Sequence, residues 1–318
     1  MIKLTINTTS NLLAFSGGID STALFFLLEN QNIPFDIAII DYEQRDSSKD
    51  EVIYATQLAH KYNKKCFIAT FDKELTFNEK NARDYRYRFF KELIKEHSYE
   101  TLLTAHQLND KLEWFLMQLS RGAGVNELLG LEEFIYKNNY TINRPLLEYS
   151  KEQLQEYLDT NNYKYFIDET NFNQNYTRNY FRHNFSDKFL SKYQKGVVRS
   201  FEYLKKDQES LLQNIKKEHI EKLTIYQFNG DINIAIKLID KDLKERGILL
   251  TKASRDEICE KKELVVSHKF AIAITDTKIY IAPYLQNNMD KEFKEKCRRK
   301  KIPKHIRPYI YTLENFSF

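Results

Sequence analysis

Apolar and polar residues along the first half of the chain form segments that predict strands followed by helices. Leu12, Leu13 and Phe15 predict a short buried strand, and from Ser21 the apolar residues recur at helical spacing. The same succession of strand and helix then repeats. Strands are expected at 35–41, 65–71 and 100–106, and helices at 49–62, at 78–97 and after 106. Repeated strand–helix units predict an α/β fold with a parallel, doubly wound sheet.

The second half of the chain loses this alternation after about Asn184. The stretch from there to about Lys222 is charged and predicts helix, and 265–283 predicts a β-hairpin turning at Asp276-Thr277. We therefore expect a catalytic domain at 1–190, a helical linker at 191–222 and a small α+β C-terminal domain at 223–318.

Composition narrows the class of protein. The 318 residues are 42% hydrophobic, without an apolar run of membrane length or a signal-peptide pattern. Three isolated cysteines, Cys66, Cys259 and Cys297, indicate a reducing cytoplasm and disfavour a zinc or iron–sulfur site. The net charge is only +4, but cations gather at 291–307. That cluster predicts either a surface for a polyanion or a solvated tail.

The segment Ser16-Gly17-Gly18-Ile19-Asp20-Ser21 joins the first strand to the first helix. Glycines let the backbone approach an anion, and the first amide groups of a helix point at it. Asp20 would repel phosphates unless a divalent cation lay between them, so the loop predicts a nucleotide with Mg²⁺. The alternative is a glycine turn that only connects a strand to a capped helix.

Two more strand ends carry polar groups, at Asp41 and His106. Ligands of open α/β sheets bind beyond such carboxyl ends. The spacing of His106, Asp110 and Glu113 puts all three on one helix face, which is either catalytic or an ordinary solvated face. In the catalytic interpretation Asp110 shares a metal with Asp20, and Glu113 orients a nucleophile or accepts its proton.

Two pairs of arginines complete the candidate chemistry. Arg83 and Arg86 share a helix face, and Arg178 and Arg182 are spaced four apart on another predicted helix. Guanidinium groups in such pairs suit the phosphates of a nucleotide or of RNA. The alternative for the first pair is surface salt bridging with neighbours such as Asp84.

Together these segments resemble the tRNA(Ile)-lysidine synthetases, a branch of the N-type ATP pyrophosphatases. The matched motifs are SGGxDS at 16–21, VDHGLR at 40–45, ARxxRY at 82–87, AHHxxDxxE…RGxG at 105–124, RPLL at 144–147, and D-x-x-N…YTRNxxRH at Asp168, Asn171 and 176–183. The chain departs from the family at Tyr42, where His is usual, and at Asn109, where many members have Asp. It also has one short C-terminal domain rather than two.

The resemblance implies a two-step ligation. O2 of cytidine 34 in the CAU anticodon of an isoleucine tRNA attacks the α-phosphate of ATP, and pyrophosphate leaves. The amine of free lysine then displaces AMP and gives lysidine. The implied ATP-binding residues are Ser16, Gly17, Gly18, Ile19, Asp20, Ser21, Asp41, Arg83, Arg86 and Arg182. The implied catalytic residues are Asp20, Asp110, Glu113, His106 and Arg178, with Mg²⁺ on Asp20 and Asp110 and with Glu113 and His106 handling lysine or its proton.

The expected partners are therefore ATP, Mg²⁺, tRNA and lysine, with no membrane, and homodimer formation is left open. The basic C-terminal segment is expected to hold tRNA through a strongly salt-dependent contact. Two alternatives stay in view. A tRNA 2-thiolation enzyme of the same fold is disfavoured by the isolated cysteines, and a non-catalytic RNA-binding protein is disfavoured by the intact loop.

Overall fold

The computed structural model describes residues 2–6, 8–43, 47–72, 74–167, 177–211 and 215–313. The chain divides into two compact units, Met1–Lys205 and Lys206–Phe318. Helix α8 (Asp187–Leu211) contains the point of division. The predicted domain limits at 190 and 222 stay a prediction, except that the expected helix does not reach Lys222, as the strand β7 described below shows.

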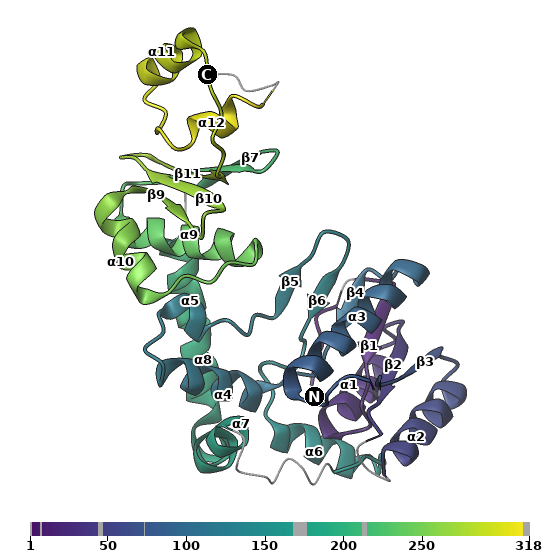
Figure 1. The fold of residues 1–318 in the computed structure, drawn as a ribbon. Helices are drawn as coiled ribbons and strands as arrows, with labels where there is room; N and C mark the ends of the chain where they lie inside the picture. Colours follow the sequence, from purple (N-terminus) through teal and green to yellow (C-terminus); the bar gives the residue numbers. More distant parts are fainter. Residues whose placement is uncertain are drawn as a thin grey trace. The chain divides into compact units, whose positions relative to one another are not determined.

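The first unit is built on a six-stranded sheet (Figure 1). Its five parallel strands are, in spatial order, β3 (Cys66–Thr70), β2 (Asp36–Asp41), β1 (Asn11–Ala14), β4 (Thr101–Leu103) and β6 (Thr141–Asn143). Strand β5 (Phe134–Tyr136) adds to β6 in antiparallel orientation at one edge. The predicted parallel sheet is confirmed, whereas β5 and β6 were not expected; β6 lies in the mostly polar stretch 137–144.

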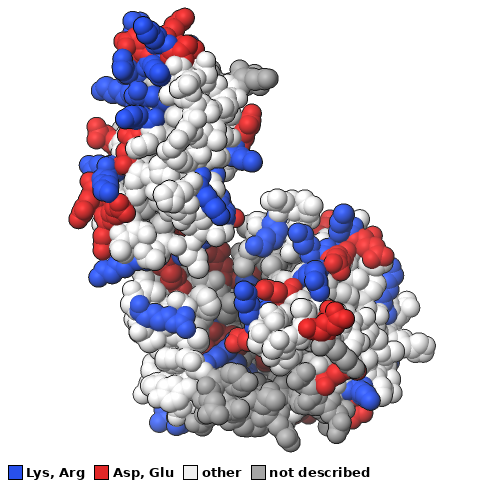
Figure 2. All heavy atoms as spheres, in the orientation of Figure 1, with Lys and Arg blue, Asp and Glu red and all other residues white. Residues whose placement is uncertain are grey.

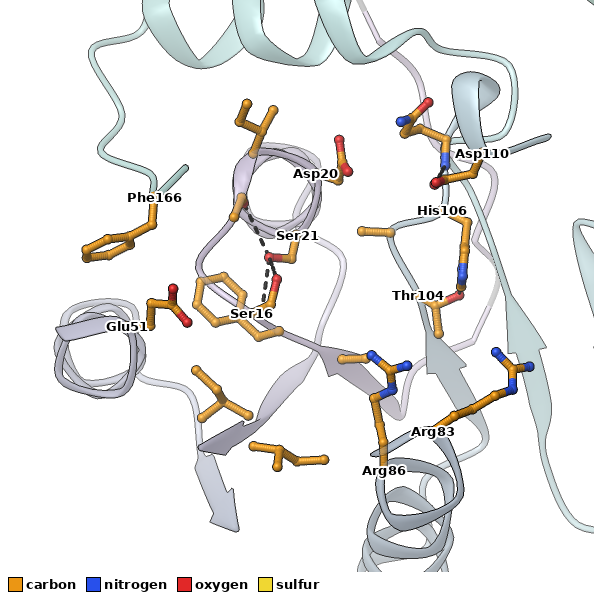
Figure 3. Close-up of a pocket in the computed structure, with 18 of the residues that line it drawn as sticks. Ser16, Asp20, Ser21, Glu51, Arg83, Arg86, Thr104, His106, Asp110 and Phe166 are labelled. Atoms are coloured by element: carbon orange, nitrogen blue, oxygen red, sulfur yellow. Dashed lines mark hydrogen bonds between the residues drawn. The ribbon is translucent and has the colours of Figure 1, made fainter. Parts of the chain in front are cut away.

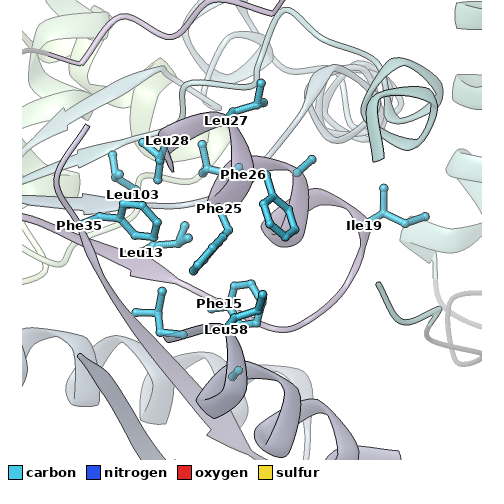
Figure 4. Packing of buried hydrophobic residues seen from close by; sticks show 14 of the residues in the cluster. Leu13, Phe15, Ile19, Phe25, Phe26, Leu27, Leu28, Phe35, Leu58 and Leu103 are labelled. Carbon is cyan, nitrogen blue, oxygen red and sulfur yellow. The ribbon is translucent and has the colours of Figure 1, made fainter. Parts of the chain in front are cut away.

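Helices cover both faces of this sheet, and strand alternation decides which side chains meet them. Leu13 and Leu103 point to the face of α1 (Ile19–Asn30), α2 (Ser47–Lys61) and α6 (Lys151–Thr160), as Figure 4 shows for α1 and α2. Leu12 and Leu102, one residue earlier on their strands, point to α3 (Glu79–His97) on the other face. Both faces are therefore buried, as parallel strands require.

Phe25 of α1 anchors the larger of these two cores. It is fully buried and packs edge-on against Phe15, Phe26, Phe35 and Tyr62, with ring centroids 5.0 to 5.9 Å away. Burial of one such side chain contributes about 2–3 kcal/mol. This core determines the position of α1 and therefore of the glycine loop at 15–18 that precedes it.

The remaining helices of the first unit are α4 (Leu108–Leu119), α5 (Val125–Leu128), α7 (Thr177–Phe181), a π-helical turn η2 (Arg182–Ser186) and α8. Leu108 and Leu112 of α4 pack with Leu190, Val197 and Phe201 of α8 in a separate apolar cluster. Thus α4, which follows β4 in the chain, packs against α8, a helix far along the sequence.

The second unit is an antiparallel sheet in the order β7 (Lys216–Ile220), β8 (Leu223–Gln227), β11 (Lys278–Pro283), β10 (Phe270–Ile274) and β9 (Glu263–Val266). The predicted hairpin is confirmed as β10 and β11. The expectation of helix as far as Lys222 was wrong, because Lys216–Ile220 pairs with β8 as an edge strand whose exposed, charged residues carry little strand signal.

Two pairs of helices enclose the sheet of the second unit. Helices α9 (Ile232–Glu245) and α10 (Lys252–Lys261) cover one face, and α11 (Lys291–Arg299) and α12 (Arg307–Ile310) cover the other. The basic C-terminal segment is therefore anchored by an apolar underside that includes Cys297. Within the described part of the chain, no helix is both long and apolar enough to cross a membrane.

Asp242 is the most deeply buried acid of the second unit, at 1% exposure. Its Oδ1 accepts a hydrogen bond from Nε of Arg246 at 2.5 Å, and its Oδ2 accepts one from the hydroxyl of Tyr226 at 3.2 Å. Burial and the adjacent carboxylate raise the pKa of Tyr226. These bonds join the end of α9 to β8 around a carboxylate that is almost fully buried.

We expect Asp242→Asn to destabilise the second unit by about 3 kcal/mol, because it leaves the Arg246 guanidinium without its buried counter-charge. The measurement is native-state hydrogen exchange of the α9 and β8 amides in the full chain. Glu245→Gln is the matched control: its carboxylate, 56% exposed, lies 3.7 Å from Lys217, and the change should cost less than about 0.5 kcal/mol. Equal effects of the two substitutions would contradict the assigned role of Asp242.

Candidate active site

The glycine loop between β1 and α1 has the geometry of an anion site. Gly17 adopts a left-handed φ of +74°, which favours glycine, and Gly18 is the N-cap of α1 without a side chain to bond the first helical amides. The Ser21 hydroxyl accepts from the Ser16 amide at 3.1 Å and lies 3.0 Å from the Ser16 hydroxyl. The loop is therefore ordered by its own serines while its helix amides point outward.

A neighbouring segment closes the back of this loop. The amide of Phe166 donates to the carbonyl of Gly17 at 2.9 Å, and the two segments form a parallel bridge. A Cβ at Gly17 would lie 3.4 Å from the Phe166 ring and 3.6 Å from Cβ of Glu51. These would be ordinary van der Waals contacts, so the backbone angle rather than the available space favours glycine at this position.

A cavity of about 510 Å³ opens above the loop at the carboxyl ends of β1, β2 and β4. Figure 3 shows Asp20 and Asp110 toward one end of it, with Arg83 and Arg86 reaching in from α3. The predicted site residues that line it are Ser16, Gly18, Ile19, Asp20, Ser21, Arg83, Arg86, His106, Asp110, Arg178 and Arg182. Gly17, Asp41 and Glu113 do not line it.

Asp20 has an unusual environment. Its Oδ1 is buried and has no hydrogen-bond partner. Burial, helped by nearby Asp110, raises the pKa of Asp20 to about 7, although Lys151 and Arg182 oppose the shift. A buried carboxylate oxygen without a donor is a position that a bound cation would satisfy.

The described residues contain no group of three or more His, Cys, Asp or Glu side chains able to hold a metal. Mg²⁺ needs no such group, because it is often bound by one or two carboxylates together with substrate phosphates and water. The unpartnered oxygen of Asp20 therefore fits Mg²⁺ that arrives with a nucleotide. Asp110, whose oxygens accept from Arg178, Arg182 and the Gln107 amide, would have to give up one of these bonds to join it.

Asp110 and Glu113 on α4 form an ion cluster with Arg178 of α7 and Arg182 of η2. Arg178 Nη2 lies 2.6 Å from Asp110 Oδ1, and its Nε lies 3.0 Å from Glu113 Oε2. Arg182 Nε lies 2.7 Å from Glu113 Oε1, and its Nη2 lies 3.3 Å from Asp110 Oδ1. We call these four residues the arginine–carboxylate cluster.

The two acids of the arginine–carboxylate cluster have pKa values shifted in opposite directions. Burial acts to raise the pKa of Asp110, but the adjacent Arg178, His106 and Arg182 hold it below its usual value. Burial and Asp110 raise the pKa of Glu113, which is fully buried with an arginine on each oxygen. Glu113 does not line the cavity, and its expected action on the nucleophile stays a prediction.

His106 was expected on the same helix face as Asp110 and Glu113, and this was wrong. Helix α4 begins at Leu108, and Gln107 and Asp110 form a reciprocal capping box that places His106 before the helix. Its Nδ1 is 3.0 Å from the hydroxyl of Thr104. Burial lowers the pKa of His106 to about 4, so the ring is neutral at pH 7 and contributes hydrogen bonds rather than charge.

Arg83 and Arg86 line the cavity rather than pairing with Asp84, since neither forms an ion pair with any residue that the structure describes. The guanidinium of Arg83 lies 4.9 Å from the ring centre of Tyr87. Both side chains therefore keep their charge for a ligand.

Sequence reasoning missed several residues that line the cavity. Lys151 lies there at the first turn of α6, with Thr104, Glu51 and Phe166. Only Lys151 had a signal, as a cation directly after the predicted N-cap Ser150. The motif positions Gln44, Arg45, Asp168, Asn171 and Tyr176 lie outside the described residues.

Comparison with known proteins agrees with this geometry. Residues 3–189 match a family model described as a PP-loop domain. The tRNA(Ile)-lysidine synthase of Campylobacter jejuni (strain RM1221) is 43% identical over 305 residues, which cover 95% of this chain and 92% of that protein. The tRNA(Ile)-lysidine synthase of Helicobacter pylori (strain ATCC 700392 / 26695) is 40% identical, with 95% and 89% covered.

A solved structure, the U34-tRNA thiolase NcsA from Methanococcus maripaludis with its [4Fe-4S] cluster, aligns with a TM-score of 0.51 at 17% identity. The alignment covers 67% of this chain and 74% of the thiolase. At that identity the likeness concerns the fold alone. The short C-terminal part noted in the sequence is shared with the two relatives above, whose lengths are almost fully matched.

Asn109 stands where many members of the family have Asp. Its hydrogen bonds show why a side-chain amide suits this position. The side chain is 5% exposed and does not line the cavity. Its Nδ2 donates to Oδ1 of Asp187 at 2.7 Å, and its Oδ1 accepts from the amide of Lys151 at 3.1 Å. The residue joins α4, α6 and α8, so an amide here, with one donor and one acceptor in use, has a structural role.

We expect Asn109→Asp to destabilise the first unit by about 1–3 kcal/mol, because it opposes a second carboxylate to Asp187 in a partly buried place. The loss should shrink as pH falls, since protonation of one carboxyl removes the repulsion. Thermal unfolding at pH 5 and pH 8 measures both effects. The double variant with Asp187→Asn should regain most of the stability, and no recovery would contradict the proposed pairing.

Proposed function

The chain belongs to the tRNA(Ile)-lysidine synthase family of PP-loop proteins, and from this premise we propose that it ligates free lysine to C2 of cytidine 34 in an isoleucine tRNA with a CAU anticodon. ATP supplies the activation, and lysidine, AMP and pyrophosphate are the products. The observation that carries the proposal is the glycine loop with the unpartnered Asp20 beneath a cavity lined by arginines.

In the first step, O2 of the cytosine attacks the α-phosphorus of ATP, the bond to the bridging oxygen breaks, and pyrophosphate leaves. The outward amides of the Gly17-Gly18 turn and of α1 would bind the leaving phosphates. Arg83, Arg86 and Lys151 would balance the charge that develops on them. Mg²⁺ held by Asp20 and Asp110 would offset the same charge.

In the second step, the ε-amine of lysine attacks C2 of the adenylated base, and the C2–O2 bond breaks as AMP leaves. Arg178 and Arg182 would bind phosphate at the α4 side of the cavity. His106, neutral at pH 7, would orient a substrate by hydrogen bonding. Glu113 would act as a positioning residue that holds the two arginines rather than as a proton acceptor.

RNA binding would extend beyond the cavity. Lysine and arginine side chains gather over α11, as Figure 2 shows, where Lys296, Arg298 and Arg299 follow one another closely. Their acidic neighbour Glu295 lies 3.3 Å from Arg298, which leaves a cationic excess. We propose that this segment contacts the phosphate backbone of the tRNA and that the reaction takes place in the reducing cytoplasm.

The thiolation alternative is weaker. Cys66, Cys259 and Cys297 are all free thiols, and none lines the cavity. Burial is the main reason that the pKa of each of these thiols is raised. A raised pKa disfavours the thiolate, which is the reactive form. A non-catalytic role is disfavoured by the complete loop geometry.

The direct test is incubation of the protein with Mg²⁺-ATP, labelled lysine and two CAU-anticodon transcripts, one isoleucine and one initiator methionine. We expect label in the isoleucine tRNA alone, with one AMP and one pyrophosphate per lysine. Pyrophosphate without lysine incorporation would move the second substrate elsewhere. No pyrophosphate from a folded, ATP-binding protein would refute the catalytic proposal.

We expect Asp20→Asn to lower pyrophosphate release at least about 10²-fold, because it removes the carboxylate that would hold Mg²⁺ against the leaving phosphates. Thermal stability should be unchanged or higher, since a buried carboxylate without a partner is costly in the free protein. Asp50→Asn, on an exposed acid of α2, is the matched control. Release near the unaltered rate in the Asp20 variant would contradict its assignment to ATP and metal.

A further inference from the structure

Four aromatic side chains lie exposed along the segment that begins at the cavity. Tyr180 is 47% exposed, Phe185 44%, Phe189 49% and Tyr193 56%. Isolated exposed apolar residues need no explanation, but a row of large rings on one helical segment does. We call these four residues the aromatic stripe.

The local backbone brings the rings of the stripe together. Phe185, Phe189 and Tyr193 recur every fourth residue, but Phe185 belongs to η2 and Tyr193 lies at a kink of α8 with a φ of −124° and a ψ of 16°, so ring contacts rather than helical spacing relate the rings. Tyr180 and Phe185 are five apart, and the π-helical turn η2 lies between them; their ring centroids are 5.9 Å apart. Phe189 and Tyr193 lie 5.0 Å apart.

A row of cations runs beside the stripe. Lys188 and Lys192 are exposed and directly precede Phe189 and Tyr193. Neither lysine forms an ion pair with a residue in the described ranges. The sole acid between 177 and 200 is Asp187, which is bonded to Asn109. The surface therefore combines planar apolar groups with uncompensated positive charge.

We propose that the aromatic stripe stacks the unpaired bases that flank the modified cytidine, while the adjacent lysines contact their phosphates. This inference rests on the proposed function, because it takes the anticodon loop as the substrate. Arg178 and Arg182 line the cavity and belong to the same α7–η2 segment as Tyr180 and Phe185. The stripe therefore begins within the segment that supplies these two arginines, and the proposal places the neighbours of a nucleotide bound in the cavity along it.

The chemistry favours single-stranded RNA over a protein partner. Exposed rings next to lysines are the pattern by which proteins bind unpaired nucleotides, since each base offers a face for stacking and each linkage a negative charge. Two copies of this chain meeting through the stripe would bring Lys188 and Lys192 of each copy close to those of the other, and no acid of the stripe region except Asp187 would offset them.

The test measures binding separately from catalysis. A fluorescent RNA hairpin with the CAU anticodon loop is titrated with the unaltered protein, with F189L/Y193L, and with F189Y/Y193F. Leucine keeps apolar volume but loses the flat ring, whereas the second variant keeps both rings. Tyr136→Leu, at a tyrosine of β5 that is 79% exposed, is the matched control.

We expect F189L/Y193L to raise the Kd for the hairpin at least about tenfold, with ATP affinity and melting temperature unchanged. The ring-preserving pair and the Tyr136 control should stay within about twofold. Equal binding by F189L/Y193L, or equal loss in the ring-preserving pair, would overturn the inference. Self-association of the unaltered protein that F189L/Y193L abolishes would overturn it too, by assigning the stripe to contact between copies.

The two proposals fail in different ways. If the unaltered protein transfers lysine and F189L/Y193L does so with the same kcat/KM, only the stripe proposal falls. If the unaltered protein binds the hairpin through the stripe but transfers no lysine to either transcript, only the ligase proposal falls.

Discussion

The arginine–carboxylate cluster is the interaction on which the candidate site depends. It joins α4 to α7 and η2, segments 65 to 72 residues apart in sequence, through groups that are mostly withdrawn from water. Two acids and two arginines give a neutral set, so burial is tolerated as long as the set is complete. Removal of one member would leave a buried charge without its partner. The cluster therefore determines where Asp110, Arg178 and Arg182 stand, and with them one wall of the cavity.

The fold could be predicted where the signal is local. Apolar runs and helical spacing gave the main strands and helices of the first unit, and parallel strands then require a site at their carboxyl ends. The prediction of strands failed where a segment is a strand only because it pairs with another strand. Strand β7 is exposed and charged, and β6 lies in a mostly polar stretch, so neither shows a buried-strand pattern. The π-helical turn η2 was not expected either, although it carries Arg182 of the arginine–carboxylate cluster.

The candidate site was predictable to the level of motif, but not to that of individual roles. Spacing placed His106, Asp110 and Glu113 together, yet the capping box at Gln107 starts the helix later and separates the histidine from it. Asp110 and Glu113 are one helical turn apart and both are buried, but only Asp110 lines the cavity, a difference that residue spacing cannot show. Lys151 lies at the cavity because α6 packs on α1 through Leu154 and Leu158 and bonds Asn109 through its own amide, contacts between distant segments that no local pattern records.

Some polar groups around the cavity have hydrogen-bond partners within the protein, and others have none. The groups without partners indicate where ligands bind. Ser16 and Ser21 bond each other, Thr104 meets His106, and Glu113 is taken by two arginines, so these residues fix geometry. In contrast, the Asp20 oxygen and the first amides of α1 lack internal side-chain partners where phosphate and cation would sit. The aromatic stripe continues this logic outside the cavity. Its rings and lysines leave apolar faces and positive charges exposed together, and an unpaired RNA strand is a ligand that satisfies both kinds of group at once.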